Sequence, residues 1–543
     1  MNISSYLLFL LLAFTFNFSA GLIQSSHGFS INEATIKDIQ QAFEDKTLTS
    51  RKLVEFYIQQ IEALNPLLKA VIEVNPDVLD QADQADKERS KGGSFSGMHG
   101  IPILIKDNIA TKDKLNTSCG SYALVGSVVP RDAGVVAKLR KSGALIMGKA
   151  SMTEWGAIRA PKLPNGWCAV SGQGRNPYYL SGNPCGSSSG SAIAVTGNLI
   201  IVSLGTETDG SILCPCSHNS VCGIKPTLGL CSRSGMIPIA PSLDTVGPIG
   251  KTVTDAVYVL DEIVGYDEFD SEATNRSKDF IPKDGYKQFL KKDGLAGKRI
   301  GVVRTPFYNF PTGSPLHKLF ADHIETMKKA GAVIVDKLNI PNIKTVLNPA
   351  LTGESQVERF EFKAALNAYL EGLISSPVRS LAEVIAFNTK HPSLEKTPTY
   401  GQDMLIAAER TGGKIGAAEI KVLEKMKKID KDGFVTLMEK NNLDAVVTPA
   451  SQFSTVLAIG GHPGISVPAG YHPNGMPIGI TFGGLRGSEP KLIEISYAFE
   501  QLTLARKPPF YQMLTKSQYT STNEEGIASS SSDSLIEMIT SPN

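Results

Sequence analysis

The fold of this chain is decided by the stretch from Gly172 to Thr227, GQGRNPYYLSGNPCGSSSGSAIAVTGNLIIVSLGTETDGSILCPCSHNSVCGIKPT. Glycine, serine and other small residues crowd there into two clusters, GSSSGS at 186–191 and GTETDGS at 205–211. The segment between them, 192–204, predicts a buried helix followed by a buried strand. Glycine lets the backbone take unusual angles and lets its N–H groups approach a ligand closely. Two hydroxyl-rich turns on rigid elements are typical of a nucleophile with an oxyanion-binding loop, and the alternative is a pair of plain Ser/Gly turns.

Helices and strands alternate along the rest of the chain. Further strands are predicted at 101–105, 144–147, 300–303, 332–335 and 445–447, and helices precede two of them, at 132–141 and 316–330. Such alternation favours a parallel or mixed sheet covered by helices. The fold class we predict is α/β, a single large domain with a central mixed β-sheet covered by helices on both faces.

The organisation along the 543 residues begins with an apolar run close to the start, Tyr6 to Phe16, followed by small residues. This pattern predicts a signal peptide and a secreted or endomembrane protein, and an uncleaved run to Ile23 is just long enough for a membrane anchor. The predicted parts are a signal peptide (1–28), one domain (29–515) and a disordered tail (516–543). The domain is divided into a helical layer (29–90), a core (91–265), a peripheral variable region (266–440) and a C-terminal core segment (441–515).

Composition excludes several classes of function. The formal net charge is +1 and 20% of the residues are charged, so nothing indicates nucleic acid or an acidic partner. The seven cysteines lack zinc-type spacing and do not form a disulfide framework, so most are expected to be buried small residues. The segment 143–149 fits part of a phosphate-binding loop, but its apolar strand residues and the following Ala150 exclude that site. Asn275, in a polar loop, is a predicted N-glycosylation site, whereas the sequon at Asn116 leads into inner-loop sequence.

Lys106 follows directly on the apolar strand at 101–105. A free lysine has a pKa near ~10.4 and is a poor base at neutral pH, but burial favours its neutral amine. A lysine directly after a buried strand is notable, because an isolated charge is rarely buried without purpose. The alternative is a strand-end lysine that faces solvent.

Several motifs together resemble the amidase signature family. The resemblance covers roughly 31–505, and it rests on the two Gly/Ser clusters together with GIPILIKDN (100–108), DAGVV (132–136), GA (143–144), CGIKPT (222–227), GHPGISVPAG (461–470) and GMPIG (475–479). The forms GSSSG and TETDG resemble the peptide-amidase-like branch, which includes plant amidases, more than the fatty-acid amide branch.

The resemblance implies a Ser–cisSer–Lys triad in a serine hydrolase. Ser211 matches the nucleophile, Ser187 the bridging serine on a cis peptide bond and Lys106 the base. The backbone N–H groups of Thr208, Asp209, Gly210 and Ser211 match the oxyanion hole. The implied reaction cleaves a small-molecule or peptide amide to acid and ammonia or amine through an acyl-enzyme, without a metal or cofactor.

Three positions depart from the family pattern. Leu213 stands where many members have an arginine, so Glu207 must find another partner or lie among backbone donors. Asp209 replaces a glycine, and its side chain is expected to point away because a carboxylate would oppose the developing oxyanion. Cys185 replaces another glycine and is expected to be structural.

Other functions share parts of this signature. GSSSG also fits the nucleophile elbow of α/β-hydrolases, with Ser188 as nucleophile and His462 or His472 as base. An amidotransferase subunit that supplies ammonia for tRNA-dependent amidation has the same signature, but a secretory leader contradicts it. A membrane-anchored hydrolase of lipid amides is the third alternative, and a catalytically dead binding protein is disfavoured because all three triad positions are occupied.

Overall fold

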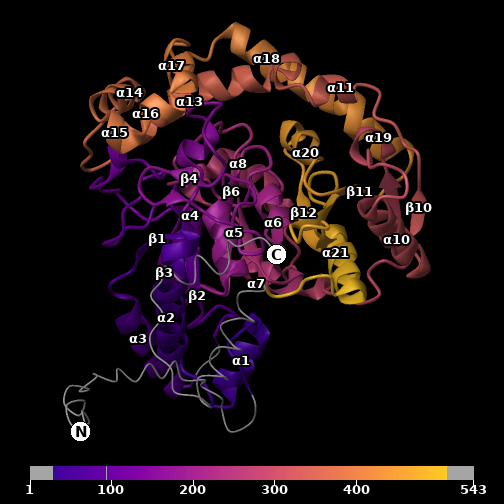
Figure 1. The fold of residues 1–543 in the computed structure, drawn as a ribbon, viewed down its shortest axis with the longest axis horizontal. Helices are drawn as coiled ribbons and strands as arrows, with labels where there is room; N and C mark the ends of the chain where they lie inside the picture. Colours follow the sequence, from indigo (N-terminus) through magenta and orange to yellow (C-terminus); the bar gives the residue numbers. More distant parts are fainter. Residues whose placement is uncertain (1–28, 93–94, 510–543) are drawn as a thin grey trace, which may run out of the picture.

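The computed structural model describes residues 29–92 and 95–509, in which eleven strands form one mixed sheet (Figure 1). In sheet order these are β1 (Val71–Val74), β3 (Leu145–Ala150), β2 (Pro102–Lys106), β6 (Val202–Glu207), β8 (Thr245–Gly250), β7 (Cys222–Lys225), β12 (Gly464–Tyr471), β13 (Pro477–Gly483), β11 (Ala445–Pro449), β9 (Arg299–Val302) and β10 (Val333–Val335). A small hairpin, β4 (Trp167–Cys168) with β5 (Gly172–Gln173), stands apart from it. The predicted class is confirmed: a single large α/β domain with a central mixed sheet flanked by helices.

The helices fall into three groups along the chain (Figure 1). Those of the N-terminal part and the central core are α1 (Ile36–Glu44), α2 (Ser50–Leu68), α3 (Val78–Ser90), α4 (Gly134–Lys141), α5 (Ser189–Thr196), α6 (Leu213–His218), α7 (Val253–Ile263), α8 (Ser271–Ser277), α9 (Arg304–Phe307) and α10 (Pro315–Lys329). A second group comprises α11 (Ile343–Val346), α12 (Pro349–Thr352), α13 (Glu354–Glu371), α14 (Leu381–Lys390), α15 (Pro392–Glu395), α16 (Thr397–Tyr400), α17 (Asp403–Glu409), α18 (Ala417–Asp430) and α19 (Thr436–Lys440). The last two are α20 (Ser454–Gly460) and α21 (Glu489–Thr503).

Strand β2 is rich in apolar residues because it lies inside the sheet, between β3 and β6. It pairs in parallel with β3 on one side and with β6 on the other, and all five of its residues are buried. A parallel strand that is covered on both faces reads as a continuous apolar run, which is the signal that predicted it. The same chain direction in β2 and β6 brings their carboxyl ends together at one edge of the sheet.

The predicted helical layer at 29–90 is interrupted by a strand. β1 pairs antiparallel with β3 and adds an edge to the sheet between α2 and α3. Asn65 accepts hydrogen bonds from the N–H groups of Ala70 and Val71, both at 2.8 Å, and so turns the chain out of α2 into β1. The four residues of β1 are too few to show a strand-like periodicity in the sequence. The strand they pair with, β3, lies some 75 positions further along the chain.

Helices α11 to α19 form an arch that spans the molecule above the body that carries β2 and β6 (Figure 1). An apolar cluster fastens the arch, and in it the ring of Phe453 packs at 5.3 Å from Phe434 and at 5.3 Å from Phe307. The predicted sequon residue Asn275 is exposed, but it lies on α8 rather than in a loop. No helix within 29–92 and 95–509 is long and apolar enough to cross a membrane. The predicted leader (1–28) and tail (516–543) lie outside the described residues.

Candidate active site

Lys106 is the last residue of β2, and its side chain is completely buried. Its Nζ lies 2.8 Å from Ser187 Oγ and 2.9 Å from Ser188 Oγ. It also lies 2.8 Å from the hydroxyl and 3.1 Å from the carbonyl oxygen of Thr206, on the neighbouring strand β6. The strand-end lysine therefore faces inward, and the alternative of a solvent-facing Lys106 is wrong.

The surroundings of Lys106 favour its neutral form. Burial lowers the pKa of Lys106 from 10.5 to about 7, against the weaker opposing influence of Cys119, Asp244 and Glu207. A neutral amine has two N–H groups and one lone pair, so one hydroxyl group around Nζ must donate to it. Ser187 is in the right position to do so, because the Ser188 hydroxyl already donates to the Thr206 carbonyl at 3.0 Å. Lys106 can therefore act as a proton acceptor near neutral pH.

Two polar neighbours of Lys106 were missed by the sequence reasoning. Thr206 Oγ1 contacts both Lys106 Nζ and, at 3.1 Å, the side-chain amide of Asn108. Both residues lie inside segments that the motifs had singled out. Their roles depend on the pairing of β2 with β6, which sequence spacing does not reveal.

Ser187 and Ser188 occupy different environments although they are adjacent. The peptide bond between Gly186 and Ser187 is cis, as the family resemblance implied. Ser188 is fully buried, and its Oγ accepts from the N–H of Thr206 as well as from Lys106. Within the described residues neither His462 nor His472 forms a hydrogen bond with Ser188, and His462 contacts Asp430 instead, at 3.0 Å. The nucleophile-elbow alternative therefore lacks its geometry.

The loop from Thr208 to Ser211 presents free backbone N–H groups. No acceptor within the described part of the chain takes a hydrogen bond from the N–H of any of its four residues. Buried backbone N–H groups are nearly always paired, so a consecutive unpaired run is typical of an anion-binding loop. Gly210 makes the turn with a φ of 76°, a conformation that side chains disfavour.

Glu207 holds this loop without the arginine of the family pattern. Its Oε2 accepts from the N–H groups of Ile212 at 2.6 Å and Leu213 at 2.8 Å. Burial raises the pKa of Glu207, and Lys225 opposes that rise. The expectation that Glu207 lies among backbone donors is confirmed, which explains how Leu213 is tolerated.

Ser211 is joined through the backbone to Ser188, the residue that follows the predicted bridging serine. The N–H of Ser188 donates to the carbonyl oxygen of Ser211 at 3.1 Å. Among the residues that the structure describes, no hydrogen bond joins the hydroxyls of Ser187 and Ser211. Lys106 and Ser187 are thus in direct contact, and Ser211 lies on the adjoining loop with 9% of its surface exposed.

A disulfide bond between Cys185 and Cys214 joins the two serine-bearing loops, with 5.8 Å between the Cα atoms. The other five cysteines are free and buried, as expected for most of them. Cys185, which was expected to be structural, is thus half of a disulfide bond that the spacing of the cysteines did not predict. Cys185 lies just before the 186–191 cluster and Cys214 lies in the first turn of α6, and these segments meet in space although 29 positions separate the two cysteines.

Replacing both Cys185 and Cys214 by serine is expected to lower the free energy of unfolding by about 3–4 kcal/mol, because the bond closes a loop of 29 positions. Thermal unfolding monitored by circular dichroism measures this as a lower Tm. Dithiothreitol should shift the wild-type Tm toward that of the double variant and leave the double variant unchanged. Equal Tm values for the oxidised wild type and the double variant would contradict the stabilising role.

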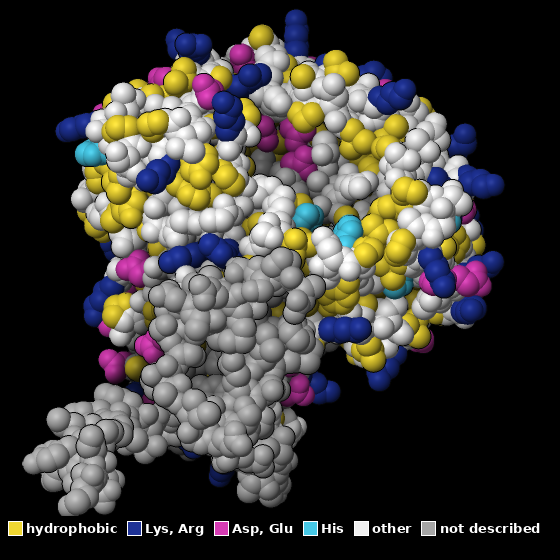
Figure 2. All heavy atoms as spheres, in the orientation of Figure 1, with side chains coloured by type: hydrophobic (Ala, Val, Ile, Leu, Met, Phe, Trp, Pro, Cys, Tyr) yellow, Lys and Arg dark blue, Asp and Glu magenta, His cyan; other side chains and the backbone are white. Residues whose placement is uncertain are grey.

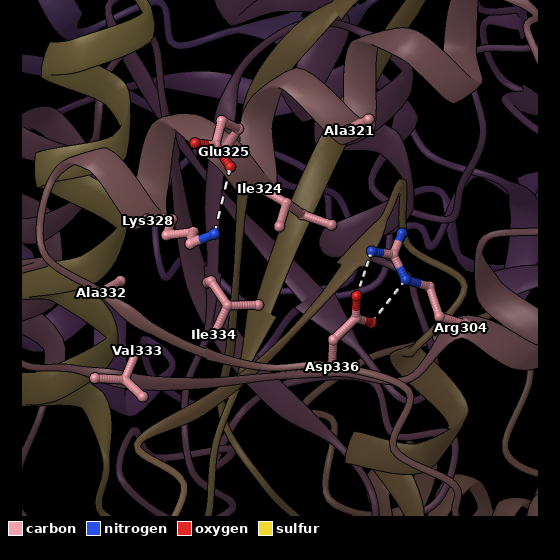
Figure 3. A pocket seen from close by; sticks show the side chains of 9 residues that line it. All are labelled: Arg304, Ala321, Ile324, Glu325, Lys328, Ala332, Val333, Ile334 and Asp336. Carbon is pink, nitrogen blue, oxygen red and sulfur yellow. Dashed lines mark hydrogen bonds and ion pairs between the residues drawn. The ribbon is translucent and has the colours of Figure 1, made fainter.

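A groove of about 550 Å³ lies far from this site, at the β10 edge of the sheet (Figure 3). Its charged side chains pair with one another, Arg304 with Asp336 at 2.7 Å and Lys328 with Glu325 at 3.9 Å. None of its lining residues matches a chemical motif of the sequence. The candidate catalytic groups lie instead near the carboxyl ends of β2 and β6.

Comparison with known proteins agrees with this geometry. The family model described as "Amidase" matches residues 52–459. A probable amidase of Arabidopsis thaliana is 55% identical over 494 residues, which cover 90% of this chain and 94% of the relative. The crystal structure of native peptide amidase from Stenotrophomonas maltophilia matches with a TM-score of 0.80 and 40% identity, covering 88% of this chain and 98% of that one.

More distant relatives include the A subunit of glutamyl-tRNA(Gln) amidotransferase from Microcystis aeruginosa. That subunit is 30% identical over 510 residues, which cover 88% of this chain and 99% of the relative. The higher identity to proteins named amidase extends over nearly the same length. The chain therefore belongs to the amidase signature family and is an amide hydrolase.

Proposed function

We propose that this enzyme hydrolyses carboxylic amides through a covalent acyl-enzyme, with Ser211 as nucleophile, Ser187 as proton bridge and Lys106 as base. One observation carries the proposal. A buried lysine whose pKa lies near 7 contacts the Ser187 hydroxyl at 2.8 Å, beside a loop of free N–H groups that ends at Ser211. These are the base, the relay and the oxyanion donors that amide cleavage requires.

In the first step Ser211 Oγ attacks the amide carbonyl carbon. Its proton passes to Ser187 Oγ while the Ser187 proton passes to Lys106 Nζ, so Lys106 becomes an ammonium. The N–H groups of the 208–211 loop hold the oxyanion of the tetrahedral intermediate. The hydroxyls of Ser187 and Ser211 must approach each other for this transfer, and such contacts commonly tighten when substrate binds.

In the second half of the reaction the protons return by the same route. Lys106 gives its proton through Ser187 to the amide nitrogen, the C–N bond breaks, and ammonia or an amine leaves. Water then attacks the acyl group on Ser211 and transfers one proton to the same relay, which restores the free serine and releases the acid. The sequence of steps balances without a metal or an organic cofactor.

Hydroxylamine tests the acyl-enzyme directly. During turnover of an active amide from a panel that runs from acetamide through indole acetamide to peptide C-terminal amides, added hydroxylamine should divert part of the product to the hydroxamate. The ammonia released per amide consumed should stay at one, because hydroxylamine intercepts the enzyme after the amine has left. If the acid were the sole product at high hydroxylamine concentration, the result would contradict a covalent intermediate. Turnover by the isolated chain would show that the reaction does not depend on amidotransferase partner subunits.

A further inference from the structure

Three carboxyl groups from two distant segments meet beside the nucleophile loop. Asp209 belongs to that loop, and Glu354 and Glu358 stand one turn apart at the start of α13. A spacing of four places the two glutamates on the same face of the helix. Asp209 and Glu358 are half-buried, and Figure 2 shows acidic side chains in the hollow between the arch and the body. The hollow therefore has an acidic wall next to the proposed oxyanion site.

Glu354 is only 2% exposed, yet no N–H or O–H group of the described residues donates to either of its carboxyl oxygens. Its side chain is directed toward the Asp209 carboxyl, which itself receives a single donor, the Thr455 hydroxyl at 2.6 Å. Buried carboxyl groups are otherwise paired with cations or hydrogen-bond donors. With a pKa near 10 Glu354 is protonated at neutral pH and can donate to Asp209, so these two carboxyl groups share one proton and carry one negative charge that no cation among the described residues neutralises.

No lysine or arginine among the described residues forms an ion pair with any of the three carboxyl groups. Arg359, beside Glu358 on α13, only weakly opposes the rise of the Glu358 pKa. The nearby carboxyl of Asp244 adds to the negative field and is occupied by the Thr208 hydroxyl at 2.6 Å. Burial and the neighbouring carboxylates raise the pKa of Glu354 to about 10 and that of Glu358 to about 7.

We propose that Asp209, Glu354 and Glu358 form a subsite for an ammonium group that the substrate carries close to the scissile carbonyl, as the α-ammonium of an amino-acid amide does. The inference rests on the proposed function. The Asp209 carboxyl belongs to the loop that would hold the oxyanion, so only a cation within a few bonds of the carbonyl reaches it. A substrate cation there also offsets the repulsion between the Asp209 carboxylate and the developing oxyanion.

An ammonium group fits this subsite better than a metal ion. An ammonium group is satisfied by one or two carboxylate acceptors, whereas Ca²⁺ or Mg²⁺ needs about six or more oxygen ligands close around it. Among the described residues, Asp209, Glu354 and Glu358 are not a group whose possible ligand atoms all lie within 4.8 Å of one another, which is the spacing that a shared metal ion needs. A substrate ammonium does not need all three carboxyl groups at once, because it can donate to one or two of them.

The test compares three amides of the same shape at pH 7: leucinamide, its 2-hydroxy analogue and 4-methylpentanamide. We expect kcat/KM for leucinamide to exceed that for the hydroxy analogue by at least about tenfold. Glu358→Gln, which keeps the size of the side chain, should remove most of this ratio, and Glu354→Gln should lower it. Glu371→Gln, on the exposed last turn of α13, is the matched control and should leave the ratio unchanged.

Binding gives a second readout that does not need turnover. Titration calorimetry of the Ser211→Ala variant should show tighter binding of leucinamide than of the hydroxy analogue, and Glu358→Gln in that background should remove the difference. Equal kcat/KM and equal binding for the two amides would overturn the subsite while amide hydrolysis stands. Preferential binding of leucinamide by an enzyme that cleaves none of the panel would keep the subsite and reject the proposed reaction. A preference that appears only with added Ca²⁺ would also overturn the inference.

Discussion

Ser211→Ala is expected to reduce amide hydrolysis by at least about 10⁴-fold, because the other hydroxyl on the loop of free N–H groups, that of Thr208, is held by Asp244 at 2.6 Å. The assay is ammonia release from the best amide of the panel, with thermal unfolding to show that the variant is folded. Ser211 is nearly buried and its Oγ makes no hydrogen bond within the described residues, so the substitution should hardly change the Tm. Hydroxamate formation in the presence of hydroxylamine should disappear together with the hydrolysis.

Two neighbouring serines provide matched controls for Ser211→Ala. Ser189 Oγ is buried without a hydrogen-bond partner among the described residues, so Ser189→Ala should leave kcat/KM within about twofold. Ser188→Ala removes contacts to Thr206 and Lys106 and should lower stability by about 1–2 kcal/mol while keeping measurable turnover. A loss in Ser188→Ala as large as that in Ser211→Ala would instead support the nucleophile-elbow chemistry.

Lys106→Arg is the second substitution with a large expected effect. Arginine stays protonated at every pH at which the protein is folded, so it keeps a positive charge but cannot accept a proton. The variant should lose activity at pH 7 by at least about 10³-fold, and Lys106→Met, which has neither charge nor base, should be equally inactive. Near-wild-type activity of Lys106→Arg would show that this position supplies charge rather than a base.

The wild-type pH profile follows from the lowered pKa of Lys106, which lies near 7. The active form is the neutral amine, so kcat/KM should rise about tenfold for each pH unit below 7 and level off above it. Burial lowers the pKa of a lysine and raises that of a carboxyl group, so groups of both kinds can titrate near pH 7. A rise in activity through pH 7 therefore identifies Lys106 only after the contribution of nearby carboxyl groups has been tested. The Glu358 carboxyl also has a pKa near 7, and the profile is therefore measured on an uncharged amide in Glu358→Gln as well. An unchanged ascending limb in that variant assigns the titration to Lys106.

Local pattern was enough to identify the elements that carry the chemistry. The apolar run at 101–105 predicted β2 within one residue of its bounds, because a parallel strand covered on both faces is nearly all apolar, here up to the buried Lys106 at its end. The Gly/Ser clusters indicated close backbone approach, and the structure shows why. A Cβ at Gly190 would lie 2.3 Å from the carbonyl oxygen of Ser151, so only glycine fits where α5 begins. Strand β1 escaped prediction because four residues carry too little pattern and its partner is distant in sequence.

The amino-acid sequence was enough to predict the α/β class and the family and to name Lys106, Ser187 and Ser211 as candidate site residues, because each is encoded in a short run of adjacent residues. Three features became visible in the three-dimensional structure alone. They are the inward direction of the Lys106 side chain, the contact of Thr206 with Lys106 Nζ and the disulfide bond between Cys185 and Cys214. The structure also shows that Glu354 and Glu358, which lie in a segment without any motif, reach the loop of Asp209. The burial of a side chain, the electric field around it and its contacts across the sheet all depend on which segments meet in space. The spacing of residues along the chain does not show which segments those are.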